Sequence, residues 1–286
     1  MTQTGHPEVV PSPAPRRRAP RWWLIAIVAV WALVLAGAAV WSVRNDPPTV
    51  VEQRDIAAAL PVLHRAAGAV VTAADAPDRT IEIGPLRFDT RCGLTSVRAG
   101  VEASQEITVR VRADQAPGAL ESIARALPRS YKPAIRHLDN DTRHVLRADA
   151  GEFIEVEATA ENDGMIIAVR ILTGCRPPNA GVDLAAAPRP AATTPDALSA
   201  AMTAVKAAGP ATSVEVACPN GKTAATVTVG GPTMSGDLGR ALRDAVGDGL
   251  VVRAEPRAWA YRVGEVSVLV TGDEGDARVS ATTSCR

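Results

Sequence analysis

The chain has 286 residues, 47% of them hydrophobic, and its 31 Lys and Arg balance 31 Asp and Glu to a formal net charge of zero. This apolar content supports packed cores and excludes a disordered chain, and the length favours two domains. A neutral chain lacks the basic domain typical of nucleic-acid-binding proteins, so we expect no nucleic-acid partner. Lysine occurs only at Lys132, Lys206 and Lys222. With abundant Ala, Gly, Pro, Val and Arg, this favours a GC-rich bacterial genome such as that of an actinobacterium.

The first predicted element is a transmembrane helix over residues 22–41, WWLIAIVAVWALVLAGAAVW, which contains no charged side chain. A helix of about 20 residues spans about 30 Å, the thickness of a bilayer's hydrocarbon. The preceding PRRRAPR carries four arginines, and the positive-inside rule places them in the cytoplasm. We therefore predict a cytoplasmic basic tail over 1–21, a stalk over 42–52 and an extracytoplasmic remainder.

A cleaved signal peptide is the alternative, because AGA at residues 36–38 has the small-x-small pattern of a cleavage site. The length of the apolar run and Trp41 at its far end favour a retained signal-anchor. Either way, the bulk of the chain is predicted to be extracytoplasmic. The first cysteine is Cys92, too far from the apolar run for a lipoprotein.

Two segments, 53–176 and 194–286, follow the same pattern and end on ILTGCR and ATTSCR, both Thr-x-Cys-Arg. Each has an Ala-rich helix, a strand leading to a cysteine, a β-branched strand, a second helix and a final group of strands. The expected starting points are Asp55 for the first helix, Pro117 for the second, Thr194 as N-cap with Pro195 as the first helical residue, and Ser235 as N-cap of the last helix. The repetition predicts one module written twice, separated by a Pro/Ala linker over 177–193.

The duplication also predicts one disulfide in each copy, Cys92–Cys175 and Cys218–Cys285, in a compartment where disulfides persist. Strand parity places all four sulfurs on the apolar faces of their strands. Val266, Val268 and Val270 alternate with Ser267 and Thr271, which fits a sheet with one buried face. The predicted fold class is α+β: an N-terminal transmembrane helix followed by two tandem, disulfide-closed modules of antiparallel sheet plus helices.

Candidate catalytic or metal-binding residues are few. The spacing of His137 and His144 around LDNDTR fits no standard zinc motif, so both are interpreted as loop or strand-surface residues. Glu155 and Glu157 lie two apart and are interpreted as the outward side of a strand. Of Trp259 and Tyr261, which share a strand face, at least one is expected in the core. We predict no catalytic residue, no metal and no cofactor, and no enzymatic activity.

One cluster of cations stands out, namely Arg125, Arg129, Lys132, Arg136, Arg143 and Arg147. Such a surface is an anion-binding patch for lipid headgroups or wall polymers, or simply a solvated surface in an Arg-rich protein.

These observations predict a single-pass protein of the cell envelope with tandem modules for binding or assembly, whose partners are the membrane and envelope proteins or an anionic wall polymer. Two alternatives stay open. One is an extracytoplasmic hydrolase with its site in the first module. The other is a structural subunit of a division, secretion or signalling complex.

Overall fold

The computed structural model describes residues 22–45, 54–95, 98–185, 187–231, 237–272 and 277–285. It divides into two units, Met1–Pro47 and Pro48–Arg286, which we describe separately. The predicted tail 1–21, most of the predicted stalk and the predicted N-cap Ser235 lie outside the described residues.

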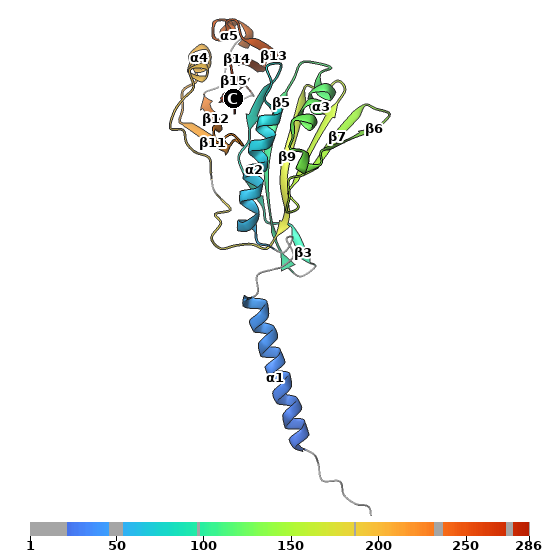
Figure 1. Cartoon of the computed structure of the whole chain (residues 1–286). Helices are drawn as coiled ribbons and strands as arrows, with labels where there is room; N and C mark the ends of the chain where they lie inside the picture. Colours follow the sequence, from blue (N-terminus) through green and yellow to red (C-terminus); the bar gives the residue numbers. More distant parts are fainter. Residues whose placement is uncertain are drawn as a thin grey trace, which may run out of the picture. The chain divides into compact units, whose positions relative to one another are not determined.

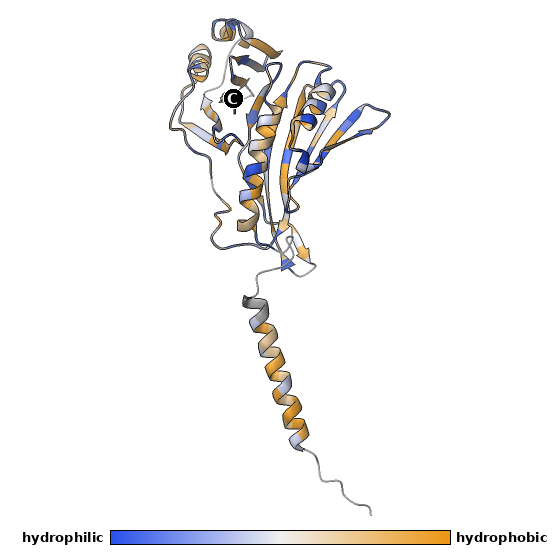
Figure 2. Ribbon diagram, viewed as in Figure 1, coloured by the Kyte–Doolittle hydropathy of each residue, from blue (hydrophilic) through white to orange (hydrophobic). Residues whose placement is uncertain are grey.

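The first unit contains helix α1 (Trp22–Asn45). Every side chain from Trp22 to Trp41 is exposed, and Figure 2 shows apolar residues along the helix. Two helices in the described residues are long and apolar enough to cross a membrane, α1 and α2 (Ile56–Ala74). They differ in burial, because 61% of the most apolar 18-residue stretch of α2 is buried and none of the apolar stretch of α1 is. The burial of α2 is that of a core helix, whereas α1 has the composition of a membrane span or signal sequence.

The second unit begins with an antiparallel sheet in the order β1-β5-β9-β8-β7-β6, and β2 also pairs with β5. Helices α2 and α3 lie on one face of this sheet (Figure 1). The elements are β1 (Thr80–Ile83), β2 (Arg87–Asp89), β5 (Val101–Arg110), α3 (Ala116–Ala126), β6 (Ala134–Leu138), β7 (Arg143–Asp149), β8 (Glu155–Glu161) and β9 (Ile166–Arg176). A small hairpin of β3 (Gly93–Thr95) and β4 (Arg98–Ala99) and a 3-10 turn, η2 (Arg129–Tyr131), complete this half.

A second antiparallel sheet has the order β10-β11-β12-β16-β15-β14-β13, with α4 and α5 packed against β13 to β16. The elements are β10 (Arg189–Pro190), α4 (Asp196–Val205), β11 (Ala211–Ala217), β12 (Thr223–Gly231), α5 (Leu238–Val246), β13 (Leu250–Glu255), β14 (Ala258–Val263), β15 (Val266–Gly272) and β16 (Ala277–Thr282). Strand β10 lies within the predicted linker 177–193. The fold is therefore mixed helix and antiparallel sheet.

The two sheets share one strand order. The strand order is β2-β5-β9-β8-β7-β6 in the first sheet and β11-β12-β16-β15-β14-β13 in the second. In both sheets, a long strand pairs with the last strand of its half, and the three strands that precede the last one in the chain follow it in reverse order. The helices occupy equivalent places in the chain, before the first strand and after the second. In both halves the threonine hydroxyl of Thr-x-Cys-Arg accepts a hydrogen bond from a backbone N–H of the neighbouring strand. Thr173 Oγ1 accepts from Ala103 N at 2.9 Å, and Thr283 Oγ1 accepts from Ala225 N at 3.0 Å.

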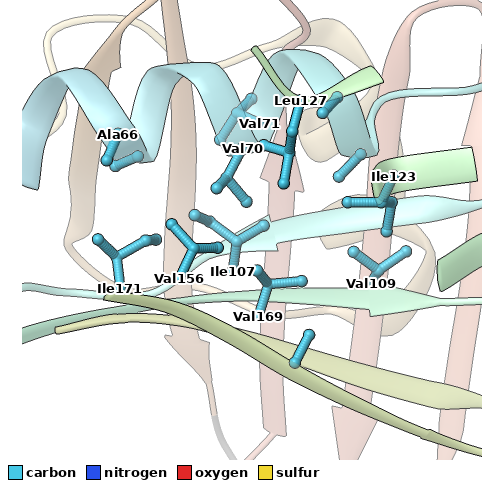
Figure 3. Close-up of a cluster of buried hydrophobic side chains, with 14 of the residues drawn as sticks. Ala66, Val70, Val71, Ile107, Val109, Ile123, Leu127, Val156, Val169 and Ile171 are labelled. Atoms are coloured by element: carbon cyan, nitrogen blue, oxygen red, sulfur yellow. The ribbon is translucent and has the colours of Figure 1, made fainter. Parts of the chain in front are cut away.

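The larger core lies between α2, α3 and the first sheet (Figure 3). Helix α2 begins at N-cap Asp55, whose Oδ1 accepts from Ala58 N at 3.0 Å. Alternate residues of the long strands point at the helices, as the period of a strand requires. Figure 3 labels Ala66, Val70 and Val71 of α2, Ile123 of α3 and the adjoining Leu127, and Ile107, Val109, Val156, Val169 and Ile171 of the sheet.

The second sheet is buried on both faces, which corrects the prediction of one buried face. Its far face packs on α2 and β1 of the first half. Strand β1 is the edge of its sheet, and two of its outward N–H groups donate to side chains on this face: Ile81 N to Ser267 Oγ at 3.1 Å and Ile83 N to Thr226 Oγ1 at 2.8 Å. Ser267 of β15, between Val266 and Val268, and Thr226 of β12 thus cap a strand edge instead of meeting water.

Both predicted disulfides are present, with Cα–Cα distances of 5.8 Å for Cys92–Cys175 and 5.7 Å for Cys218–Cys285. Cys92–Cys175 joins the segments that precede and follow β5, and Cys218–Cys285 joins the segments that precede and follow β12. Cys218 and Cys285 are buried, in the core that contains α2, whereas Cys92 and Cys175 are half-buried.

The parity prediction for the sulfurs is wrong at two positions. Between Thr173 and Cys175, Gly174 has φ +63°, and the pairing of β9 with β5 shifts register there. One extra residue in a strand reverses the facing of those beyond it, so Cys175 leaves the core face. Cys285 follows the end of β16 and lies in the α2 core, whereas Val279 and Ala281 belong to the α4–α5 core.

Three helix starts also differ from prediction. Helix α3 begins at Ala116, one residue before the predicted Pro117. The N-cap of α4 is Pro195 rather than Thr194, and it makes no side-chain cap bond. The N-cap of α5 is Asp237 rather than Ser235, because the Asp237 carboxylate accepts from Gly239 N at 2.9 Å.

Candidate functional site

The structure divides the six predicted cations between two surfaces. Arg125 lies on α3 and Arg129 in η2, on the helical side of the first sheet. Ile135 of β6 and Leu146 of β7 are paired and point toward the helices. Side chains alternate along a strand, so the opposite face carries Arg136 of β6 and Arg143 and Arg147 of β7. Lys132 is exposed in the left-handed conformation at the end of η2.

The cations of β7 are balanced by carboxylates. Arg143 Nε lies 2.9 Å from Asp139, and Arg147 lies 3.5 Å from Glu155 and 3.6 Å from Glu157. Glu155 and Glu157 are on the outward side of β8, as predicted, since Val156 and Ala158 are buried. This face is a mixture of charges rather than a basic surface.

Arg125 and Arg129 instead line a groove of about 540 Å³ between α3 and β6. Its remaining walls are Glu121, Ala124, Leu127, Pro133 and Ile135. Within the described residues, no carboxylate forms an ion pair with either arginine; Arg125 Nε reaches only the Glu121 carbonyl, at 3.4 Å. Two guanidinium groups beside an apolar floor can bind an anion attached to an apolar or carbohydrate body. We call these residues the α3–β6 groove.

The hairpin of β6 and β7 also brings together His137, Asp141 and His144, whose ligand atoms lie within 4.8 Å of one another. His137 and His144 are directly paired across the two strands. His137 is on the exposed strand surface, as predicted, but His144 is buried. The sequence signal for this cluster is the symmetric placement of the histidines about the LDNDTR turn, which makes them a cross-strand pair. Because the two histidines lie on neighbouring strands rather than on one helix, their spacing matches no helical zinc motif.

The remaining residues considered in the sequence lie in a turn, in the second core and on helix α2. The LDND segment forms the β6–β7 turn, in which Asp139, Asn140 and Asp141 all have positive φ. Tyr261 is fully buried in the second core, and Trp259 packs against the same core, as expected. His64 lies on α2, and partial burial lowers the pKa of its imidazole.

The sequence matches no family model and no curated protein. Among solved structures, it is similar to a DUF4853 family protein from Actinomyces odontolyticus, at 17% identity over 59% of this chain and 88% of that chain. The TM-score is 0.33.

Proposed function

We propose that this chain is a single-pass protein of the cell envelope whose extracytoplasmic part, built from two copies of one module, binds an anionic envelope component. One observation carries the proposal: an apolar helix with no buried residue precedes a unit that holds all four cysteines in two disulfides. Disulfides of this kind form outside the cytosol, and the arginines before α1 favour a cytoplasmic N-terminus.

The proposal of two copies is supported by the shared strand order and by the threonine contacts. Thr173 and Thr283 bond to alanines on equivalent strands, two residues before equivalent cysteines. This gives the repeated Thr-x-Cys-Arg a structural reason, since its threonine ties the strand end to its neighbour beside the disulfide.

The two copies do not offer equal surfaces. The far face of the second sheet is occupied by α2 and β1, whereas the α3–β6 groove is open. The groove is therefore the surface that we propose for the anionic partner, with Arg125 and Arg129 as its charged contacts.

Membrane topology is tested by adding protease to intact cells and to lysed cells that express the full chain with a tag at each end. The proposal expects the C-terminal tag to be lost from intact cells while the N-terminal tag stays on a membrane fragment that resists carbonate extraction. Release of an intact, N-terminally shortened protein into the medium would show cleavage near residues 36–38 instead.

Anion binding is tested by cosedimentation of the detergent-solubilised full chain with insoluble cell wall that retains its anionic polymer, at low and high salt. The double variant Arg125→Gln/Arg129→Gln is expected to bind about 10-fold more weakly at low salt, since two charge-assisted contacts are lost. The matched control Arg143→Gln/Arg147→Gln removes the same charge from the balanced face and should retain binding. Equal loss in both variants would show nonspecific attraction, and no loss in either would reject the groove.

Assembly with envelope proteins is tested by pull-down from native membranes with the full chain and with a variant whose residues 22–41 are replaced by an unrelated membrane span. A partner captured by both proteins binds outside the membrane, as we propose. A partner lost on replacement would favour a structural subunit that assembles through α1.

A further inference from the structure

We propose that His137, Asp141 and His144 form a binding site for a divalent transition-metal ion, with Zn²⁺ as the ion that this donor set suits best. The site is independent of the α3–β6 groove and of the proposed anionic partner. It lies at the end of the β6–β7 hairpin and uses two imidazole nitrogens and one carboxylate oxygen, the ligand types that Zn²⁺ takes in proteins.

The donor atoms already converge. His137 Nδ1 lies 2.8 Å from His144 Nδ1 and 2.8 Å from Asp141 Oδ1, and His144 Nδ1 lies 3.9 Å from the same oxygen. Ligand atoms about 2.0–2.1 Å from a tetrahedral Zn²⁺ are separated by about 3.3 Å. The observed distances bracket this value, so small side-chain rotations suffice to admit the ion.

Asn162 fixes which nitrogen of His144 faces the cluster. Asn162 Nδ2 donates to the Asp141 carbonyl at 2.9 Å, which turns its Oδ1 toward His144 Nε2, 2.8 Å away. An amide oxygen only accepts, so His144 Nε2 carries the proton and the lone pair of Nδ1 points into the cluster. A hydrogen bond of this kind, to the far nitrogen of a ligating histidine, is characteristic of zinc sites.

The backbone holds these groups in place. His144 has only 8% of its side chain exposed, and its register opposite His137 and Ala160 is set by the ladders on both sides of β7. The two imidazole rings are inclined at 88°. The left-handed turn over Asp139, Asn140 and Asp141 returns the Asp141 carboxylate to the cluster.

Two features fit an ion at the surface rather than a structural core site. His137 and Asp141 have 52% and 72% of their side chains exposed, so the fourth coordination position faces water. All four cysteines are in disulfides and do not compete for the metal.

The test is isothermal titration of the full chain in detergent with ZnCl₂ alone, in a buffer that does not chelate. Every protein carries His6→Ala to remove the histidine of the N-terminal tail. One Zn²⁺ per chain is expected. Asp141→Asn keeps the turn conformation and removes the charged ligand, and it should weaken Zn²⁺ binding at least about 10-fold; Asn162→Ala should weaken it about 10–100-fold through the orientation of His144.

His64→Ala is the control, because His64 lies on α2, outside the cluster, and it should leave Zn²⁺ affinity unchanged. Circular dichroism of each variant checks the fold. Substitution with Co²⁺ should give the visible absorption of a tetrahedral ion in the parent and lose it in His137→Ala. Zn²⁺ affinity that is equal in the parent and Asp141→Asn, or an absence of binding at millimolar Zn²⁺, would overturn the site.

Discussion

The guanidinium of Arg262 lies 2.8 Å from the carboxylate of Asp75, with 4% and 1% of the two side chains exposed. Asp75 ends helix α2 of the first half, and Arg262 lies on β14 of the second. A second link is made by Glu82 of β1, which lies 3.0 Å from Arg110 and 2.7 Å from Arg278. The two halves are therefore held together by a buried ion pair and a partly exposed one as well as by apolar contacts.

We predict that Arg262→Met lowers the free energy of unfolding by about 3–5 kcal/mol, because it removes the cation that lies 2.8 Å from the buried Asp75 carboxylate. Adding Asp75→Leu should restore part of this loss by removing the buried negative charge. Denaturant unfolding of the full chain in detergent, followed by circular dichroism, measures both. The control is Arg253→Met, which breaks the more exposed pair of Arg253 and Glu255 and should cost less than about 1 kcal/mol.

We predict that Gly68→Ala destabilises the fold by about 1–3 kcal/mol. A Cβ at Gly68 of α2 would overlap the carbonyl of Ala217, so α2 could not approach the end of β11. Gly118→Ala on α3 is the matched control, since a Cβ there meets nothing within 4 Å; alanine should stabilise that helix by up to about 1 kcal/mol. Thermal unfolding of the two variants checks the difference in sign. Stabilisation by both would mean that helix propensity rather than close approach decides.

Tyr261 is fully buried, and its hydroxyl has no hydrogen-bond partner among the described residues. We predict that Tyr261→Phe is neutral or stabilises by about 1 kcal/mol at pH 7, because no hydrogen bond is lost and a polar group leaves the core. A loss of several kcal/mol on this substitution would contradict the isolated hydroxyl.

The same residue predicts a pH dependence. Burial raises the pKa of Tyr261 to about 12, from 10.0 in the unfolded chain. The folded state then holds its phenol proton more tightly, so the contribution to stability is complete below pH 10 and is lost as the pH rises from 10 toward 12. Unfolding free energies at pH 9 and pH 11 measure it: the parent should lose more stability over this range than Tyr261→Phe.

The two disulfides should differ in reactivity rather than in their effect on chain entropy. They close loops of 83 and 67 residues, and both lengths correspond to about 4–5 kcal/mol in the chain-entropy model. Cys218–Cys285 is buried, whereas Cys92–Cys175 is half-buried. We therefore expect a mild thiol reductant to open Cys92–Cys175 first, because attack requires access to the sulfur.

Mass spectrometry after partial reduction and alkylation identifies which cysteines react. Peptides from the unreduced protein should join Cys92 only to Cys175 and Cys218 only to Cys285. A cross-link between the halves would contradict both the pairing and the proposal of two copies.

The sequence predicted both histidines as loop or strand-surface residues and the six cations as one cluster. The interpretation fails for His144, which is buried, and for the cluster, which the structure divides, and the physical reason is the same. Neighbours in the chain alternate between two faces of a strand, so Arg136 and His137 lie on opposite sides of β6. The pairing of β6 with β7 then brings His137 to His144, while α3 brings Arg125 to the helical side. Only the register and the helix placement determine these neighbours.

The sequence by itself determined the apolar helix, the cysteine pairs and the alternation of helices and strands in each half. These follow from hydropathy, periodicity and the repeat, which are local or directly comparable along the chain. The tertiary structure alone decided that the hydroxyl face of the second sheet caps β1, that Asp75 meets Arg262, and that Gly174 turns Cys175 from the core. Such contacts join residues far apart in the chain, and their free energy depends on how whole surfaces pack, which no short stretch of sequence encodes.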